Sequence, residues 1–154
     1  MITCLPVNTP DRAEQLRVLR NECAEWMTRD TRPVTKSRQR VFFEEKNATG
    51  RVEGFLMFDG EDPVAYGLLI WDEEGRAWSS TGVTPSRRGE GFGEAVTIEN
   101  VRRAHAHGVP MWAEVRRDNA GQQKICARIG YRWTAELERN GHLVDVMRCD
   151  GLAP

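Results

Sequence analysis

The sequence lacks an apolar run long enough to cross a membrane, and residues 1–6 contain no basic segment leading into an apolar one. We therefore expect a cytoplasmic protein with no signal peptide and no membrane partner. The sequence also lacks an excess of either charge, because 22 Lys and Arg side chains face 23 Asp and Glu side chains, for a net charge of −1. A general electrostatic attraction to nucleic acid is not expected.

Cysteine and histidine are few and scattered. The four cysteines include no Cys-x-x-Cys pair, and none of the three histidines stands at ligand spacing. The sequence thus predicts no metal site, and free thiols are expected in a cytoplasmic setting. A chain of 154 residues is long enough to bury its own core, and neither a repeat nor a linker interrupts it. We expect a single domain over residues 1–154.

Two helical patterns come first in the chain. Thr9 is a plausible N-cap for a helix that starts at Pro10, and apolar residues then recur every three or four positions up to Trp26. Thr35 caps a second helical pattern that runs to about Lys46. A short strand is expected before them, over residues 2–6.

Strand periodicity begins at Val52. Three short runs, residues 52–58, 65–71 and 77–83, are separated by acidic, glycine-containing turns and predict an antiparallel meander. A helix to about His107 then leads to a strand over residues 111–116, and this step requires a parallel neighbour. A helix over residues 120–128, a hairpin of residues 131–137 and 142–149, and a frayed tail from Gly151 complete the prediction.

These elements predict an α/β (α+β) fold. Its sheet is mixed, mostly antiparallel and of six to seven strands, flanked by about four helices.

The most informative stretch is residues 83–96, where a strand end, a glycine-rich turn and a helix start follow one another. Gly89, Gly91 and Gly93 let backbone amides approach an anion, and a helix N-terminus lies behind them. Arg87 and Arg88 add positive charge. A Walker loop would need Gly-Lys-Ser/Thr and a dinucleotide fingerprint Gly-x-Gly-x-x-Gly, and both are missing, so nucleotide binding is the weaker hypothesis for this phosphate cradle.

The spacing Arg88-x-x-Gly91-x-Gly93, preceded by Val83-x-Pro85, resembles the acyl-CoA loop of the GCN5-related N-acetyltransferases (GNAT). A second run, Asn119-Ala120 followed by Ala127-Arg128-Ile129-Gly130-Tyr131, is similar to the family's second signature. The two matches cover residues 65–133, a little under half of the chain. The resemblance implies the acyl-CoA N-acyltransferase fold and acetyl-CoA as co-substrate.

The resemblance also implies a binding site. The sheet is expected to splay between the third meander strand and the strand of residues 111–116, with the pantetheine arm in the gap and the pyrophosphate on the loop amides. The implied cofactor-binding residues are Gly82, Val83, Arg88, Gly89, Glu90, Gly91, Phe92, Gly93, Glu94 and Asn119. The first two helices would wall the acceptor site with Trp26, Met27, Arg29, Asp30, Arg32 and Phe43, although residues 29–38 are equally consistent with a solvated basic surface.

The sequence departs from the family pattern at two catalytic positions. Cys126 stands where many relatives have a tyrosine, and Ser79 and Ser80 stand where many have a strand carboxylate. Cys126 is a candidate proton donor to the leaving thiolate, with core packing as the alternative. Glu114 is the candidate base because it shares a strand face with Trp112 and Arg116 beside the gap.

Two further bases are open, Glu53 on the meander and a water chain to bulk solvent. The resulting hypothesis is an N-acetyltransferase that moves an acetyl group from acetyl-CoA to a primary amine of a small molecule or a peptide. The alternative is a non-catalytic acyl-CoA-binding sensor or regulatory module, which the two departures favour. Homodimer formation, common among the relatives, is a further expectation.

Overall fold

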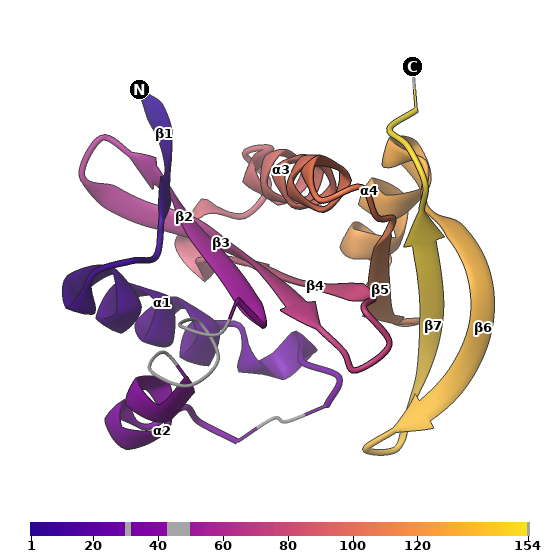
Figure 1. The fold of residues 1–154 in the computed structure, drawn as a ribbon, viewed down its shortest axis with the longest axis horizontal. Helices are drawn as coiled ribbons and strands as arrows, with labels where there is room; N and C mark the ends of the chain where they lie inside the picture. Colours follow the sequence, from indigo (N-terminus) through magenta and orange to yellow (C-terminus); the bar gives the residue numbers. More distant parts are fainter. Residues whose placement is uncertain (30–31, 43–49, 154) are drawn as a thin grey trace.

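The computed structural model describes residues 1–29, 32–42 and 50–153 of the chain. Their strands form one sheet of seven in the order β1-β2-β3-β4-β5-β7-β6 (Figure 1). The strands are β1 (Ile2–Pro6), β2 (Val52–Asp59), β3 (Asp62–Trp71), β4 (Ala77–Val83), β5 (Met111–Arg116), β6 (Arg132–Arg139) and β7 (His142–Cys149). Every neighbouring pair is antiparallel except β4 and β5. The predicted mixed, mostly antiparallel sheet is confirmed.

Helices cover both faces of this sheet. The described helices are α1 (Pro10–Glu22), α2 (Lys36–Val41), α3 (Phe92–Ala106) and α4 (Ala120–Ile129), with short 3₁₀ turns η1 (Ala24–Trp26) and η3 (Pro85–Arg87). The first two lie on one side of the sheet and the last two on the other (Figure 1). Thr9 and Thr35 cap α1 and α2 as predicted, by accepting from the amides of Arg12 and Arg38, each at 3.2 Å. The predicted extension of α2 to Lys46 lies outside the described residues.

Two apolar layers sandwich the sheet. On the α1 side, Leu16, Leu19 and Cys23 pack with sheet residues such as Tyr66 and Leu68, which confirms that the apolar stripe of the first helix is core. On the other side, α3 and α4 bury a layer against β4, β5 and β7. Trp26, which follows α1 in the turn η1, was predicted to belong to the same apolar stripe but is 37% exposed.

The sheet splits between β4 and β5. These strands pair over only three positions, Ala77 with Met111, Trp78 with Trp112 and Ser79 with Ala113. Beyond Ser79 and Ala113 both strands continue without pairing to each other (Figure 1). The predicted splay is confirmed, and its apex lies at Ser79.

Two boundary predictions were wrong. Strand β6 runs to Arg139, so the turn to β7 is the two residues Asn140 and Gly141, whose φ values of 52° and 79° suit a type I′ turn. The tail that was predicted to be frayed is held to the fold at Ala153, because the Ala153 amide donates to the Ile129 carbonyl at 2.6 Å. Both outcomes depend on backbone contacts that a local pattern does not show.

The described residues contain neither a membrane-spanning helix nor a metal-binding cluster. No helix there is both long and apolar enough to cross a membrane. In the same part of the chain, no group of three or more His, Cys, Asp or Glu side chains is arranged to hold a metal ion. All four cysteines are free thiols.

Candidate active site

The glycine-rich loop ends in the first turn of α3. Gly91 is the N-cap residue, with φ of 91°, and the first amides of the helix have no intrahelical acceptor. A Cβ atom built on Gly89 or on Gly91 would meet nothing within 4 Å, so the space above both residues is open. Open space in front of a helix N-terminus with unpaired amides fits a phosphate group, as the sequence predicted.

Side chains of the loop are engaged in ion pairs and a ring contact. Arg87 binds Asp59 at 2.7 Å and Glu90 at 2.9 Å and lies over the Phe92 ring. Glu94 binds Arg128 of α4 at 3.2 Å. The main-chain amides at the start of α3 thus remain without an intrahelical acceptor, and the cofactor-binding roles predicted for Glu90, Phe92 and Glu94 stay predictions.

Arg88 points back toward the sheet. Its Nε donates to the Val83 carbonyl at 3.2 Å, and its Nη1 donates to Glu25 of η1 at 2.9 Å. The guanidinium thus bridges the last residue of β4 and the turn after α1. In this arrangement Arg88 lies beside the last residue of β4.

Backbone groups of alternate β4 residues face the gap. The Thr84 amide donates to the Val64 carbonyl, and this makes Val83 and Ala65 a non-hydrogen-bonded pair of the antiparallel ladder. The amides and carbonyls of Thr81 and Val83 therefore point toward β5, where the splay leaves them without a strand partner. The Val83 carbonyl accepts instead from Arg88 Nε and Cys23 Sγ, at 3.2 and 3.4 Å. Such groups can bond an extended amide chain laid in the gap, as an added strand does.

Gly82 contributes in another way. Its main-chain groups face Tyr66 on β3, its hydrogen-bonded partner in the ladder. A Cβ atom on Gly82 would lie 2.5 Å from Tyr66 Cε1 and 2.8 Å from Cys23 Sγ. The glycine is thus required by close packing beside the gap. The amide that faces the gap is that of the neighbouring Thr81, which the sequence did not identify as a site residue. Only the register between β3 and β4 shows this.

Asn119 lies where β5 leads into α4. Its Oδ1 caps α4 by accepting from the Gln122 amide at 3.3 Å. Its Nδ2 donates to no residue that the structure describes, so this group is available to a ligand in the gap. The prediction for Asn119 is compatible with this placement.

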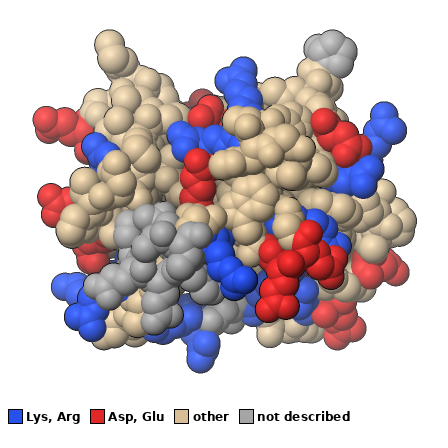
Figure 2. Space-filling model, viewed as in Figure 1, with Lys and Arg blue, Asp and Glu red and all other residues tan. Residues whose placement is uncertain are grey.

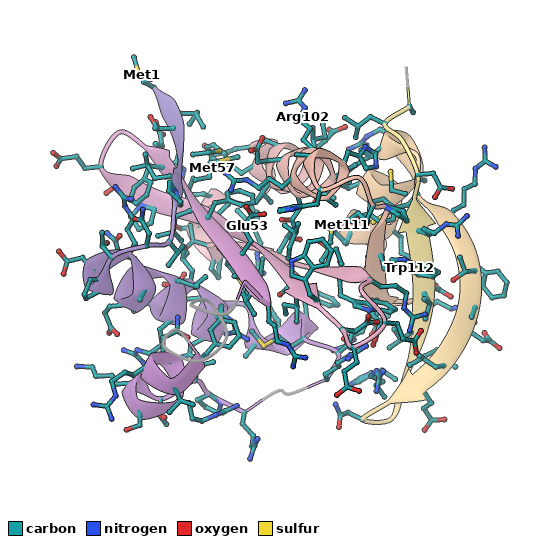
Figure 3. All side chains as sticks on the ribbon, in the orientation of Figure 1. Met1, Glu53, Met57, Arg102, Met111 and Trp112 are labelled. Carbon is teal, nitrogen blue, oxygen red and sulfur yellow. The ribbon has the colours of Figure 1, made fainter. Side chains whose placement is uncertain are left out.

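The opposite face of the splay carries tryptophan and arginine side chains. Met111 and Trp112 are neighbours on β5 that the pleat turns to opposite faces, with Met111 buried under the helices (Figure 3). The Trp112 ring lies 5.6 Å from that of Trp78 on β4, and Arg29 lies over Trp78. This face is the one that the sequence assigned to the acceptor.

The turn between β6 and β7 reaches over the same face. Asn140 Nδ2 donates to the carbonyls of Thr28 and Arg29, each at 3.0 Å. Arg116 lies over the Trp26 ring at 5.1 Å. The segment after α1 therefore forms a wall here, and its predicted role in binding the acceptor stays a prediction. Asp30 and Phe43 of that prediction lie outside the described residues.

Glu114 lies beneath this wall. Its side chain is 5% exposed and binds two guanidinium groups, Arg29 and Arg139, the latter at 2.5 Å. Burial opposes ionisation of the carboxyl, but the hydrogen bonds from Arg139 and Arg29 outweigh it, so the pKa of Glu114 lies below its ordinary value. Glu114 is therefore held as a carboxylate, a state that binds cations well and accepts protons poorly.

Cys126 lies on the α4 side of the gap and is fully buried. Burial raises the pKa of its thiol to about 12, against the weaker opposing effect of a hydrogen bond from Gln122. Its neighbours in the core include Ala77, Ala113 and Tyr131. The thiol is protonated at neutral pH but is a weaker acid than an ordinary thiol.

Glu53 is remote from the gap (Figure 3). It lies on β2, two strands away from β4, and faces α3, where His107 Nε2 is 3.5 Å and Arg103 Nη1 is 4.0 Å from its carboxylate. This placement removes the geometric basis for the alternative base.

Asp145 on β7 is a supporting residue that sequence reasoning missed. Its buried carboxylate accepts from Arg117, Gln123 and Trp133, at 2.6, 2.9 and 3.0 Å. Arg117 precedes Asn119 by two positions and Gln123 is on α4. Asp145 thus fixes the start of α4 against the sheet. In the sequence, only the position of Asp145 between two apolar residues of β7 could have indicated a buried supporting role.

Comparison with known families gives a match over most of the chain. The model of the Acetyltransferase (GNAT) family matches residues 14–131. Among curated proteins, none matches the sequence.

Solved structures share the fold at low sequence identity. The yncA acetyltransferase of Salmonella typhimurium, solved with its cofactor acetyl-CoA, is 15% identical with a TM-score of 0.81, over 99% of this chain and 97% of its own. The ribosomal-protein-alanine N-acetyltransferase of Brucella melitensis is 18% identical with a TM-score of 0.80, over 96% of this chain and 98% of its own. The ribosomal-protein-S18-alanine N-acetyltransferase of Escherichia coli is 16% identical with a TM-score of 0.74, over 100% and 97%.

Proposed function

The chain belongs to the GNAT family of acetyltransferases, and from this premise we propose that it transfers an acetyl group from acetyl-CoA to a primary amine of a small molecule or a peptide. It is an acyl-CoA-dependent N-acyltransferase with acetyl-CoA as co-substrate. The observation that carries the proposal is the gap between β4 and β5, which leads from the open glycine loop to Ser79 and exposes the backbone of Thr81 and Val83.

The described residues offer groups that suit the pyrophosphate and the pantetheine arm of acetyl-CoA. The amides that begin α3 would hold the pyrophosphate, and the gap-facing groups of Thr81 and Val83, with Asn119 Nδ2, would bond the pantetheine amides. Acetyl-CoA would supply the thioester, and the chain's own groups would orient it. An unpaired amide of β4 in the gap, at Thr81 or Val83, would meet the developing oxyanion.

An acceptor would approach from the face that carries Trp78 and Trp112. Figure 2 shows basic and acidic side chains beside each other on this side of the molecule. The named relatives that act on ribosomal-protein alanine make a peptide amine one arm of the acceptor screen, with small primary amines as the other.

We propose one GNAT-like domain over residues 1–154, and a cytoplasmic location because all four thiols are free, as in reducing compartments. Assembly into a homodimer stays a prediction, with size-exclusion chromatography coupled to light scattering as its measurement.

Calorimetric titration with acetyl-CoA, with ATP as the comparison, is the first test of this function. We expect saturable binding of acetyl-CoA alone, followed by amine-dependent release of free thiol in a screen of small amines and peptides. Binding of ATP in place of acetyl-CoA would overturn the assignment of the loop.

A non-catalytic acyl-CoA sensor is the second candidate, favoured by the low pKa of Glu114 and the high pKa of Cys126. Tight acetyl-CoA binding without thiol release from any amine would support the sensor.

The role of Glu114 as general base stays a prediction, and the pKa of its carboxyl group can be measured directly. Because Arg139 and Arg29 lower its pKa, we expect its carboxyl carbon to titrate below the ordinary glutamate pKa of about 4.3 in an NMR pH titration. Its contribution to stability is then present above that ordinary pKa and is lost as the pH falls through the lower folded value. Glu114→Gln assigns the resonance, and titration near neutral pH would instead suit a base.

The role of Cys126 as proton donor to the leaving thiolate also stays a prediction. Transfer of a proton from a thiol with a pKa of about 12 to a coenzyme thiolate with an ordinary pKa of about 8.5 is unfavourable. We therefore expect Cys126→Ala to keep its acetyl-CoA affinity and to keep turnover within about threefold of wild type. Slower turnover by tenfold or more at unchanged affinity would establish the donor role.

A further inference from the structure

Glu25, in the turn η1, is bonded from the unpaired ends of both β4 and β5. Its carboxylate accepts from Arg88 Nη1 at 2.9 Å, and Arg88 Nε donates to the carbonyl of Val83, the last residue of β4. The Glu25 carbonyl accepts at 2.7 Å from Nη1 of Arg116, the last residue of β5. Both contacts lie beyond the three paired positions of these strands. A single residue of η1 therefore connects the coenzyme loop, through Arg88, with the far strand of the splay.

The Val83 carbonyl has no lone pair to spare. A carbonyl oxygen has two lone pairs, and here its two donors are Arg88 Nε at 3.2 Å and Cys23 Sγ at 3.4 Å. The thiol is buried in one cluster with Leu16 and Leu19 of α1, whereas the Arg88 side chain is 36% exposed. An amide N–H that approaches this carbonyl from the gap therefore replaces the guanidinium rather than the thiol.

The ion pair between Arg88 and Glu25 is weak enough to open. The two side chains are 36% and 60% exposed, and water solvates such a pair well, so the pair contributes little to stability. A phosphate group, in contrast, offers several oxygens to the forked guanidinium. Arg88 directly precedes Gly89, above which the space is open. Rotation of the Arg88 side chain about its own bonds is therefore enough to exchange the carboxylate for a phosphate on the loop.

We propose that the Arg88–Glu25 ion pair is an autoinhibitory contact that competes with coenzyme A for Arg88 and for the Val83 carbonyl. This inference rests on the proposed function, in which a pantetheine amide bonds to Val83 and the pyrophosphate lies on the glycine loop. As the coenzyme enters, its amide takes the Val83 carbonyl, and Arg88 leaves Glu25 for a phosphate. Glu25 keeps its bond from Arg116, so η1 stays attached to β5 while it is released from the coenzyme loop.

Calorimetric titration of Glu25→Gln with coenzyme A tests this competition. Glutamine keeps the size of the side chain and removes the charge that holds Arg88, so we expect the affinity to rise about three- to fivefold above that of wild type. Arg88→Ala is expected to weaken binding about tenfold, because a charge-assisted bond to phosphate is lost. Equal affinities of wild type and Glu25→Gln, or an unchanged affinity of Arg88→Ala, would overturn the proposal.

Two comparisons separate this effect from a general loss of negative charge. Glu22, the last residue of α1, binds the Thr84 hydroxyl at 2.6 Å at the start of the same loop, whereas Arg88 pairs with Glu25. Glu22→Gln removes an equal charge, and we expect its affinity within about 1.5-fold of wild type. In the double variant of Glu25→Gln and Arg88→Ala, the gain should disappear. A gain that persists without Arg88, or an equal gain in Glu22→Gln, would count against the competition and overturn it.

Failure of the proposed function gives a different result. If wild type, Glu25→Gln and Glu22→Gln all fail to bind coenzyme A, the loop is not a coenzyme site, and this inference falls with its premise. If all three bind equally well, the proposed function stands and only the competition is overturned.

Discussion

Gly91→Val is expected to weaken acetyl-CoA binding at least about 100-fold while the protein stays folded. Gly91 has a φ of 91°, which a β-branched residue resists, and it begins α3 at the open side of the loop. A valine would either move the loop or place methyl groups where the anion has to sit. Loss of two charge-assisted bonds from amides to phosphate is enough for an effect of this size.

Calorimetric titration with acetyl-CoA measures the effect, and the chain offers a matched control. Gly108, at the other end of α3, has a φ of 77° and open space in place of a Cβ. Gly108→Val therefore introduces a similar backbone strain far from the loop, and we expect it to cost stability but not affinity. Tight binding by a folded Gly91→Val protein would show that the phosphates of acetyl-CoA lie elsewhere.

Local patterns predicted the elements of this fold well, because each pattern reports a local physical requirement. Thr9 and Thr35 stand where helix amides need an acceptor, and both cap their helices as expected. The glycine spacing around Gly91 identified the loop, since positive φ and open space are properties of single positions. The parallel step into β5 followed from its connection through a helix.

Long-range contacts decided what the sequence could not predict. Which β4 amides face the gap depends on the register with β3, and that register assigns the role to Thr81 and Val83. Burial raises the pKa of Glu114, and Arg29 and Arg139, 85 and 25 positions away in the chain, lower it below its ordinary value. No rule of sequence spacing connects residues so far apart in the chain. From the sequence, Glu114 was therefore expected to be an unpaired base beside the gap, whereas in the structure it is a carboxylate paired with two arginines.

Asp145→Ala is expected to cause the largest loss of stability of any single change considered, about 3 kcal/mol. The side chain is 8% exposed and accepts from three side chains on three different segments, Arg117, Gln123 and Trp133. Removing the carboxylate leaves these donors without their shared acceptor. Urea denaturation gives the free energy of unfolding, and acetyl-CoA affinity should fall as well because the start of α4 at Asn119 loses its anchor.

The pH dependence of this loss separates the carboxylate's charge from its packing. The hydrogen bond from Arg117 lowers the pKa of Asp145, burial raises it, and Trp133 and Gln123 lower it further, so the folded value lies below the ordinary one. The stability that the charge contributes is present above the unfolded pKa of about 3.9 and disappears as the pH falls through the folded pKa. The stability difference between wild type and Asp145→Asn should therefore shrink in acid.

A matched change at Asp150, directly after the end of β7, tests whether burial of Asp145 is the cause. Asp150 also binds an arginine, Arg148 at 3.0 Å, but its side chain is 60% exposed. Because water solvates an exposed ion pair well, Asp150→Ala should change the free energy of unfolding by less than about 0.5 kcal/mol. Equal losses for Asp145→Ala and Asp150→Ala would mean that the three-way contact at Asp145 does not hold α4 to the sheet. A large loss at Asp145 alone would link the stability of the fold to the geometry of the coenzyme site.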